Sequence, residues 1–439
     1  MSFEWIPFTE LLLSIVDNRG RTCPVGDSGI PLIATNCISN NSLYPACETV
    51  RFVDDETYRT WFRGHPKPGD ILFVCKGSPG RTNWVPDPVG FCIAQDMVAV
   101  RADSSKIYPK YLFAVLRSSI VQAQIDNMHV GSMIPHFKKG DFNKLNIPVP
   151  DQERQEFIGD YYFAISERIS LLRETNSTLE AVARAFFKSW FVDFDPVRLK
   201  AEGLEPEGLD AATSALFPNS FDESDLGLVP MGWTTRPIYE MASYINGAAY
   251  KTFEPNSERR GLPIIKIAEL KSGVTSQTAF SDIDMPAKYL IDTGDILFSW
   301  SGNPDTSIDT FVWGYEPALL NQHIFRVLPH DPIDRSFVLQ VLKNLKPVFA
   351  ELARNKQTTG LGHVTVADLK RLHIVYPPKA IIEQFNSIVE PIHQMIFGNE
   401  QRAHTLTQLR DTLLPRLISG QLRLPEATAA TEKILSEAI

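Results

Sequence analysis

The pentapeptide Gly69-Asp-Ile-Leu-Phe73 is repeated further along this 439-residue chain as Gly294-Asp-Ile-Leu-Phe298. Other matched strings flank both copies in the same order, at an offset of about 227 residues: Gly29-Ile-Pro-Leu-Ile with Gly261-Leu-Pro-Ile-Ile, Ala94-Gln95 with Asn321-Gln322, His136 with His363, Asp141 with Asp368, and 145–150 with 372–377. This shared order predicts an internal duplication, in which each half of the chain folds alike.

Each half begins with short apolar runs separated by Gly, Pro, Asn and Asp. These runs predict strands at Ile71–Val74, Met97–Val100 and Ile296–Ser299, and short helices at Tyr111–Ser118 and Phe337–Leu345. The expected fold class is therefore α/β in the mixed (α+β) sense. One domain covers residues 1–150 and its repeat covers 236–377.

Each half ends in a long uninterrupted helix, over 151–194 and 378–420, and Asp151 is the predicted N-cap of the first. Apolar residues recur at alternating spacings of four and three, which is the heptad of a coiled coil. The first seam is Ile158, Tyr162, Ile165, Ile169, Leu172, Asn176, Leu179, Ala183, Phe186 and Trp190, and the second is Phe385, Val389, Ile392, Ile396, Asn399, Ala403, Leu406, Arg410, Leu413 and Leu417.

Asn176 and Asn399 interrupt the two seams and are predicted to fix the register of the helices. Arg410 interrupts the second seam again, and Leu409 is the apolar alternative. Pseudo-two-fold symmetry predicts an antiparallel pair, so that each helix leaves its own domain and reaches the other. A helix of roughly 40 residues spans about 60 Å. The alternative is that each helix packs only on its own domain.

Charge is unevenly distributed along the chain, whose net charge is −9. Residues 151–235 carry 7 basic and 16 acidic side chains, whereas 1–150 carry 15 and 14, and 236–377 carry 15 of each. Near-neutral domains can each present a local basic face. The acidic linker 195–235 is predicted to be an exposed loop, and 421–439 a tail.

The five cysteines are odd in number and form no C-x-x-C motif, which predicts free thiols in a reducing cytoplasm. The start of the chain does not resemble a signal peptide, and no apolar run is long enough to predict a membrane span.

Motifs of catalysis are missing from the sequence. It contains no G-x-x-x-x-G-K-[ST] for ATP, no H-E-x-x-H for zinc, and no Asn-Pro-Pro-aromatic string of the kind that amino-methyltransferases use. We therefore expect a non-catalytic chain without a metal or cofactor of its own.

The chain resembles the specificity (S) subunit of type I restriction–modification enzymes. The resemblance lies in two domains each followed by a long helix, in the string Ala185-Phe-Phe-Lys-Ser-Trp-Phe-Val-Asp-Phe-Asp-Pro-Val197, and in Leu413-Leu-Pro-Arg-Leu-Ile-Ser-Gly420. It implies two target-recognition domains that each read one half of a bipartite DNA site, with the antiparallel helices setting the gap. It also implies two methyltransferase (M) subunits and motor–nuclease (R) subunits as partners, which carry S-adenosylmethionine, ATP and magnesium.

Candidate DNA contacts are polar and basic residues on loops at matched positions of the two domains, because Arg suits guanine, Asn suits adenine and Lys suits phosphates. In the first domain they are Arg19, Arg21, Lys76, Ser78, Arg81, Asn83, Trp84, Ser132, His136, Lys138 and Lys139; in the second they are Lys251, Trp300, Ser301, Asn303, Gln357, Thr358, Thr359 and His363.

Two other interpretations stay open. A coiled-coil scaffold could join proteins and ignore DNA, which a salt-dependent gel shift would distinguish. A self-contained methyltransferase or nuclease would need the catalytic motifs that the sequence lacks.

Overall fold

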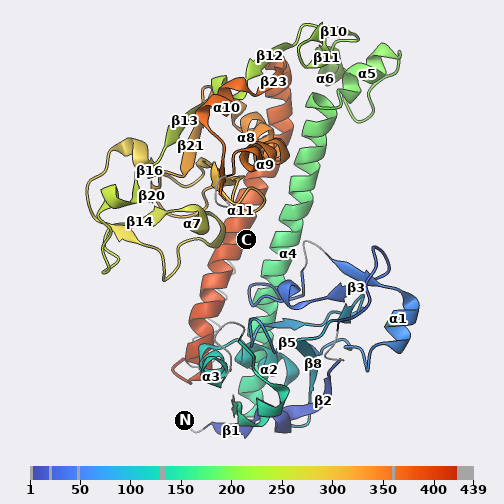
Figure 1. Ribbon diagram of the computed structural model, residues 1–439, viewed down its shortest axis with the longest axis vertical. Helices are drawn as coiled ribbons and strands as arrows, with labels where there is room; N and C mark the ends of the chain where they lie inside the picture. Colours follow the sequence, from blue (N-terminus) through green and yellow to red (C-terminus); the bar gives the residue numbers. More distant parts are fainter. Residues whose placement is uncertain (1–2, 19–21, 47–49, 129–134, 358–360, 423–439) are drawn as a thin grey trace. The chain divides into compact units, whose positions relative to one another are not determined.

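The computed structural model describes residues 3–18, 22–46, 50–128, 135–357 and 361–422. The chain divides into two compact units (Figure 1). Unit 1 consists of residues 1–173 and 402–439, and unit 2 of residues 174–401. Each unit therefore combines one domain of the repeat with parts of both long helices.

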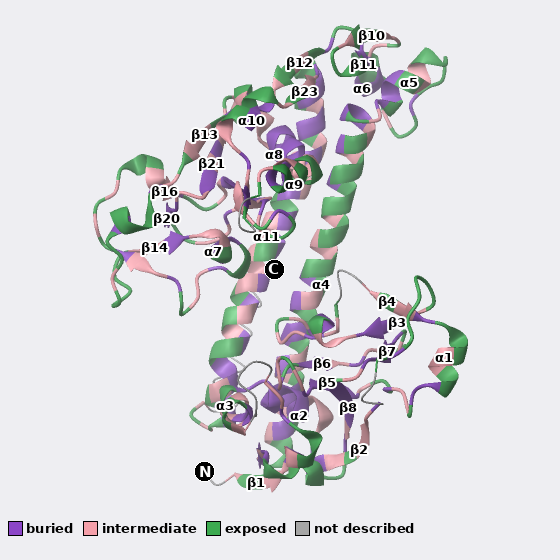
Figure 2. Ribbon diagram, in the orientation of Figure 1, coloured by how far each residue is buried: buried purple, intermediate pink, exposed green. Residues whose placement is uncertain are grey.

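Unit 1 contains two small sheets and a terminal strand pair, with strand orders β2-β8-β5-β6, β4-β3-β7 and β1-β9. The strands are β1 Glu4–Pro7, β2 Leu12–Val16, β3 Ile30–Ile33, β4 Arg51–Val53, β5 Ile71–Val74, β6 Thr82–Trp84, β7 Cys92–Ile93, β8 Met97–Ala102 and β9 Asn146–Val149. The short helices α1 Asp55–Thr60, α2 Pro109–Leu116 and α3 Ser119–Met128 accompany them. Both β5 and α2 are largely buried, as Figure 2 shows.

Unit 2 repeats this plan with more strands. Its sheets have the orders β13-β21-β17-β19, β15-β14-β20-β16, β12-β23, β18-β22 and β10-β11. The strands are β10 Phe221–Ser224, β11 Gly227–Pro230, β12 Thr234–Pro237, β13 Ala242–Asn246, β14 Leu262–Ile265, β15 Phe280–Ser281, β16 Leu290–Ile291, β17 Ile296–Ser299, β18 Ser301–Gly302, β19 Asp309–Val312, β20 Ala318–Leu320, β21 Ile324–Pro329, β22 Gly362–His363 and β23 His373–Tyr376. The helices are α5 Asp195–Ala201, α6 Ala211–Leu216, α7 Ile267–Ser272, α8 Arg335–Asn344, α9 Lys346–Asn355 and α10 Val366–Arg371.

The repeated Gly-Asp-Ile-Leu-Phe string forms the same local structure in both units. Its apolar residues form the buried strands β5 and β17. The aspartate before each strand pairs with an arginine of the neighbouring strand, Asp70 with Arg101 and Asp295 with Arg326, each over 2.7 Å. The mixed α/β fold and the duplication are thus confirmed, and the repeated aspartate stabilises the start of its strand.

The two long helices are α4, Gln152–Phe191, and α11, Lys379–Ile418, of 40 residues each. Asp151 accepts a hydrogen bond from the Arg154 amide over 3.0 Å, which confirms the predicted N-cap. The helices pair with one another inside each unit, so the alternative of helices packing only on their own domains is wrong.

The pairing in unit 1 is apolar and antiparallel. Ile165, Ile169 and Leu172 of α4 form one buried cluster with Ala403 and Leu406 of α11. Further along α11, Leu413 and Leu417 join the core of the first domain, which also contains Ile158 of α4. The end of α11 is therefore built into the domain at the opposite end of the sequence.

Arg410 occupies the seam position in unit 1, so the alternative that Leu409 takes this position is wrong. Its side chain is buried, with the guanidinium 5.3 Å from the centre of the Tyr162 ring and Nε 2.8 Å from Asp411 Oδ1. A cation over a tyrosine face with a carboxylate beside it is stabilised enough to occupy an otherwise apolar seam. Leu409 is only partly buried.

The pairing in unit 2 is antiparallel too and ends in an aromatic cluster. Phe187 and Trp190 of α4 pack on Phe385 of α11, with ring centres 6.1 and 6.0 Å apart. Phe186, which the heptad placed in the seam, is only half-buried, whereas Phe187 is buried. The strict heptad therefore fails in the last turns of α4, where the helix packs against its domain as well as against α11.

The acidic segment 195–235 is folded, which corrects the prediction of an exposed loop. It forms α5, α6 and the β10–β11 hairpin. Val197, Phe217 and Trp233 are buried in the core of unit 2. These scattered apolar residues anchor a segment whose overall composition is typical of a loop.

The cysteines also require a correction. Cys23, Cys75 and Cys92 are free and buried, as expected, but Cys37 is disulfide-bonded. An odd count and a missing C-x-x-C motif do not reveal which cysteines the fold brings together. No helix in the described ranges is long and apolar enough to cross a membrane.

Candidate nucleic-acid interface

Two of the candidate loops in unit 1 meet. Lys76 and His136 form an antiparallel bridge, although 60 residues separate them in the sequence. Around the bridge, the Gly77 amide donates to the Pro135 carbonyl and the Phe137 amide to the Cys75 carbonyl, each over 2.9 Å. The loop after β5 is therefore held against the loop that contains His136.

Unit 2 contains the same junction at the repeat positions. Ser301 pairs with His363 and Gly302 with Gly362, which forms the short β18–β22 ladder. The Val364 amide donates to the Trp300 carbonyl over 2.8 Å, as Phe137 does to Cys75 in unit 1. The duplication has thus preserved a contact between segments that are distant in the sequence.

A turn from a third segment joins each junction. In unit 1 the Asp96 carbonyl accepts from the amides of Cys75 and Lys76, over 2.8 and 3.2 Å. In unit 2 the His323 carbonyl accepts from the Trp300 amide over 3.3 Å.

The end of a strand supplies the fourth segment. Asp17 pairs with Lys139 over 2.6 Å in unit 1, and Asn246 accepts from the Trp300 indole N–H over 3.1 Å in unit 2. We call the resulting cluster the four-segment site: residues 17, 75–76, 95–96 and 136–139 in unit 1, and residues 246, 300–301, 322–323 and 363–364 in unit 2.

The two four-segment sites share a backbone plan but present different side chains. The site of unit 1 is charged, with Asp17, Asp96 and three lysines, Lys76, Lys138 and Lys139. The site of unit 2 is neutral and aromatic, with Asn246, Trp300, Gln322, His323 and His363. A common scaffold with different surface chemistry suits two domains that bind different sequences.

The lysines of the unit 1 site differ in availability. Lys138 is exposed and Lys76 half-buried, and neither forms an ion pair or side-chain hydrogen bond with any residue that the structure describes. Lys139 is paired with Asp17. Lys76 and Lys138 are thus the cations available to a phosphate here.

The stretch after β5 contains both surface and core residues. Arg81 is exposed and Ser78 half-buried. Asn83 is fully buried, and its amide donates to the carbonyls of Ser42 and Leu43 over 2.7 and 3.2 Å. Asn83 is therefore corrected from a base contact to a residue that holds the neighbouring loop.

Trp84 requires a similar correction. It is half-buried and packs edge-on against Phe113 and Phe163, with ring centres 5.6 and 5.1 Å apart. Arg81 lies before β6 and is exposed, whereas Asn83 and Trp84 lie within β6 and pack into the fold, so this polar stretch divides between the surface and the core.

The remaining candidates in unit 2 lie around its four-segment site. Asn303 is exposed, and its side-chain oxygen accepts from the amides of Asp305 and Thr306 over 3.0 and 3.1 Å, which stabilises its own turn. Lys251 and Gln357 are exposed. The candidates outside the described residues are Arg19, Arg21, Ser132, Thr358 and Thr359.

Sequence reasoning missed the turn Gln322–His323, its counterpart Gln95–Asp96, and Asn246. The match between Ala94-Gln95 and Asn321-Gln322 was the available signal, because it placed a glutamine at the same point of both repeats. By itself, this match indicates only the duplication.

The chemistry of the sites suits binding. Within the residues that the structure describes, no group of three or more His, Cys, Asp and Glu could hold a metal ion. Burial raises the pKa of the Cys75 thiol to about 12, so Cys75 stays protonated at neutral pH and is a poor nucleophile.

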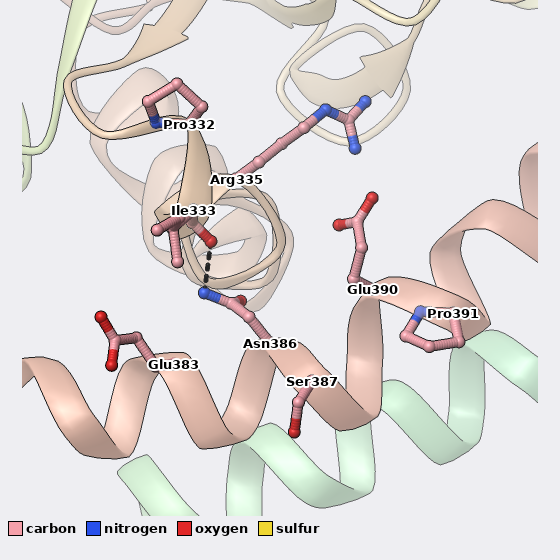
Figure 3. Close-up of a pocket in the computed structure, with 8 residues that line it drawn as sticks. All are labelled: Pro332, Ile333, Arg335, Glu383, Asn386, Ser387, Glu390 and Pro391. Carbon is pink, nitrogen blue, oxygen red and sulfur yellow. Dashed lines mark hydrogen bonds between the residues drawn. The ribbon is translucent and has the colours of Figure 1, made fainter.

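A surface pocket in unit 2 lies beside α11 and is lined by none of the residues of the four-segment site (Figure 3). Its lining includes Ile333, Arg335 and Glu383, and the Asn386 amide donates to the Ile333 carbonyl over 2.6 Å. In unit 1 the repeat position of Asn386 is Gly159, where an added Cβ would lie 2.6 Å from the Tyr111 amide nitrogen. The glycine allows close helix packing in unit 1, whereas asparagine fills more space in unit 2.

The scaffold is duplicated, and its two loop sites carry different side chains. This arrangement is that of a recognition protein with two binding sites. The family model described as "Type I restriction modification DNA specificity domain" matches residues 24–181 and 230–413, and the chain belongs to that family.

Individual relatives agree with the family assignment. The type I restriction enzyme HindI specificity subunit of Haemophilus influenzae is 25% identical over 411 residues, covering 81% of this chain and 87% of its own. The MjaIX specificity subunit of Methanocaldococcus jannaschii is 22% identical over 353 residues, covering 77% and 76%. The solved S subunit from M. genitalium shares the fold, with a TM-score of 0.55, 15% identity, and coverage of 95% of this chain and 96% of that one.

Proposed function

We propose that this chain is the non-catalytic DNA sequence-specificity subunit of a type I restriction–modification complex, and that each unit binds one half of a bipartite duplex target. The observation that carries the proposal is the pair of four-segment sites. They have one backbone plan and different side chains, and the chain belongs to a DNA-specificity family.

Both sites offer groups that suit DNA. Lys76 and Lys138 provide cations for phosphates in unit 1, and Arg81 provides an exposed guanidinium nearby. In unit 2, Lys251 lies in the segment that follows Asn246. Hydrogen-bonding side chains without a role in the fold are then available for base edges in the major groove.

The helices α4 and α11 have a further role in this proposal. Their paired seams would set the gap between the half-sites and provide docking surfaces for two methyltransferase subunits in the cytoplasm. Methyl transfer, DNA cleavage and the cofactors S-adenosylmethionine, ATP and magnesium would belong to the methyltransferase and motor–nuclease subunits.

An exchange of domains tests the proposal. The chain is purified with its methyltransferase partner, and bound sequences are selected from a duplex library at several salt concentrations. Replacing residues 1–150 with the matching domain of a relative should change one half-site and leave the other. A scaffold that ignores DNA would select no motif, and a change in both half-sites would contradict separate reading.

A further inference from the structure

Gln322 is held in one orientation by the residue that follows it. Its side-chain nitrogen Nε2 lies 3.2 Å from Nε2 of His323. Because an amide nitrogen can only donate, the imidazole nitrogen must accept, which requires the neutral tautomer with its proton on Nδ1. One amide N–H of Gln322 is therefore engaged, whereas the second N–H and the carbonyl oxygen form no hydrogen bond with any residue that the structure describes.

The His323 ring contacts Trp300 of the four-segment site, which Asn246 holds in turn. It lies against Trp300, with ring centres 5.6 Å apart, and the indole N–H of Trp300 donates to Asn246 over 3.1 Å. Asn246, Trp300 and His323 thus form a row of contacts that ends at Gln322. A side chain positioned through supporting contacts loses less entropy on binding than a freely rotating one.

The backbone on both sides of Gln322 is fixed, whereas the side chain serves no other element of the fold. The Asn321 amide donates to Ile265 over 3.1 Å and the His323 carbonyl accepts from Trp300. Gln322 remains half-exposed. Asn83 shows the opposite pattern, since it is buried and its amide is bonded to carbonyls of the fold.

We infer that Gln322 is a specificity-determining residue of unit 2 that reads an adenine, and that His323 is its positioning residue. The inference rests on the proposed function. A glutamine amide pairs with adenine through two hydrogen bonds, donating to N7 and accepting from the N6 amino group. The N–H and carbonyl that His323 leaves free are this donor and acceptor.

The surroundings of Gln322 suit DNA. Lys266 directly follows the strand residue that binds Asn321, and its ammonium lies 4.3 Å from the centre of the Tyr250 ring. Lys251, next to Tyr250, is exposed. These two cations can bind phosphates beside the base that Gln322 reads.

Gln95 occupies the repeat position in unit 1 and is also half-exposed. Its neighbour there is Asp96, whose carboxylate cannot take the place of an imidazole that packs against a tryptophan ring. The contact that orients the glutamine is therefore found in unit 2 and not at the repeat position in unit 1.

The test selects bound duplexes from a library of bipartite targets, with the full chain in complex with its methyltransferase partner. The wild-type protein is run first, and a protein that selects no motif contradicts the proposed function itself. With a wild-type motif in hand, Q322A should reduce the preference for adenine at one base pair of one half-site by about tenfold or more. The other half-site should be unchanged.

Q322E should create a new base preference, which a folding defect cannot produce. Glutamate accepts from the N4 amino group of cytosine, so the selected base should change from adenine to cytosine at the same position. H323A should weaken the adenine preference, and H323N should restore part of it, because an asparagine carbonyl can accept from the Gln322 amide. The control is Q277A, which removes an exposed glutamine outside the four-segment site.

Two results would overturn the assignment. One is a wild-type motif at every position for both Q322A and Q322E. The other is loss of binding to all sequences by both variants, because a base-reading residue changes preference rather than binding as a whole.

Discussion

Asn399 donates from its side-chain nitrogen to the side-chain oxygen of Asn176 over 2.9 Å, joining the two long helices within unit 2. Asn176 in turn donates to the Ile396 carbonyl over 3.0 Å. Each asparagine interrupts an apolar seam, and these two hydrogen bonds satisfy both side-chain nitrogens and the Asn176 oxygen. A polar pair of this kind specifies one alignment of two helices at a cost in stability.

Replacing one asparagine should therefore be worse than replacing both. N176L leaves the Asn399 amide without its partner in a seam where it is 8% exposed, which should cost about 1–3 kcal/mol of unfolding free energy. The double variant N176L/N399L should recover most of this loss, because two leucines pack well. Urea unfolding of the four proteins of the double-mutant cycle measures the coupling. Equal and additive losses would show that the pair does not act as a unit.

Arg81 and Asn83 lie two residues apart and should behave differently. R81A should leave stability unchanged, since Arg81 is exposed. If Arg81 contacts a base, R81A should cost about 1–3 kcal/mol of binding at one position of the site. If R81A instead weakens binding to all DNA sequences alike, Arg81 contacts a phosphate.

N83A should lower stability by about 1–3 kcal/mol, because it removes the hydrogen bonds from Asn83 to the Ser42 and Leu43 carbonyls and leaves the Ser39 amide without its acceptor. The selected DNA motif should stay the same in the protein that remains folded. Thermal unfolding and library selection on R81A and N83A separate DNA contact from a role in stability. An altered motif together with normal stability for N83A would show that Asn83 contacts DNA after all.

Gly159 is needed because α2 approaches α4 closely. In G159A the added methyl would lie 2.6 Å from the Tyr111 nitrogen, which should cost about 1–3 kcal/mol through overpacking. Gly398, on α11, has nothing within 4 Å of an added Cβ, so G398A should instead stabilise its helix by about 0.5–1 kcal/mol. The urea midpoint should fall for G159A and rise for G398A. An unchanged midpoint for G159A would mean that α2 can move away from the added methyl at little cost.

His393 should make the stability of unit 2 depend on pH. It is buried, with Nδ1 2.7 Å from the Ser336 hydroxyl and Nε2 2.9 Å from the Gln340 amide nitrogen. Burial, followed by Lys343, lowers the pKa of His393 to about 4, while Glu390 opposes this shift. The ordinary value is about 6.5, so protons bind the unfolded chain more strongly.

The stability that neutral His393 contributes should thus be present above pH 6.5 and fall as the pH drops toward 4, by about 1.4 kcal/mol per pH unit. Urea unfolding from pH 7.5 to 4.5 measures this slope. H393Q, which cannot take up a proton, should flatten it, and an unchanged slope would assign the pH dependence to other groups.

The sequence determined the duplication, the strands around Gly-Asp-Ile-Leu-Phe, the two heptad helices and the asparagines in their seams. These features depend on the local order of residues, since strand and helix periods are short and the repeat copies them. The same local signals misplaced segment 195–235, where three buried apolar residues outweigh a loop-like composition. The heptad placed Arg410 in the seam correctly, but it could not show why a cation is stable there, because the Tyr162 ring that covers it lies 248 positions away in the sequence.

Only the tertiary structure decided which loop side chains the fold uses and which it leaves free. Arg81 and Asn83 belong to one polar stretch, yet Arg81 lies exposed before β6, whereas Asn83 lies within β6 and is buried against the carbonyls of Ser42 and Leu43. Gln322 gained its importance in the same way, since its orientation depends on His323, Trp300 and Asn246, which come together only when three segments meet. A contact between distant segments depends on how the whole chain packs, and no local pattern encodes it.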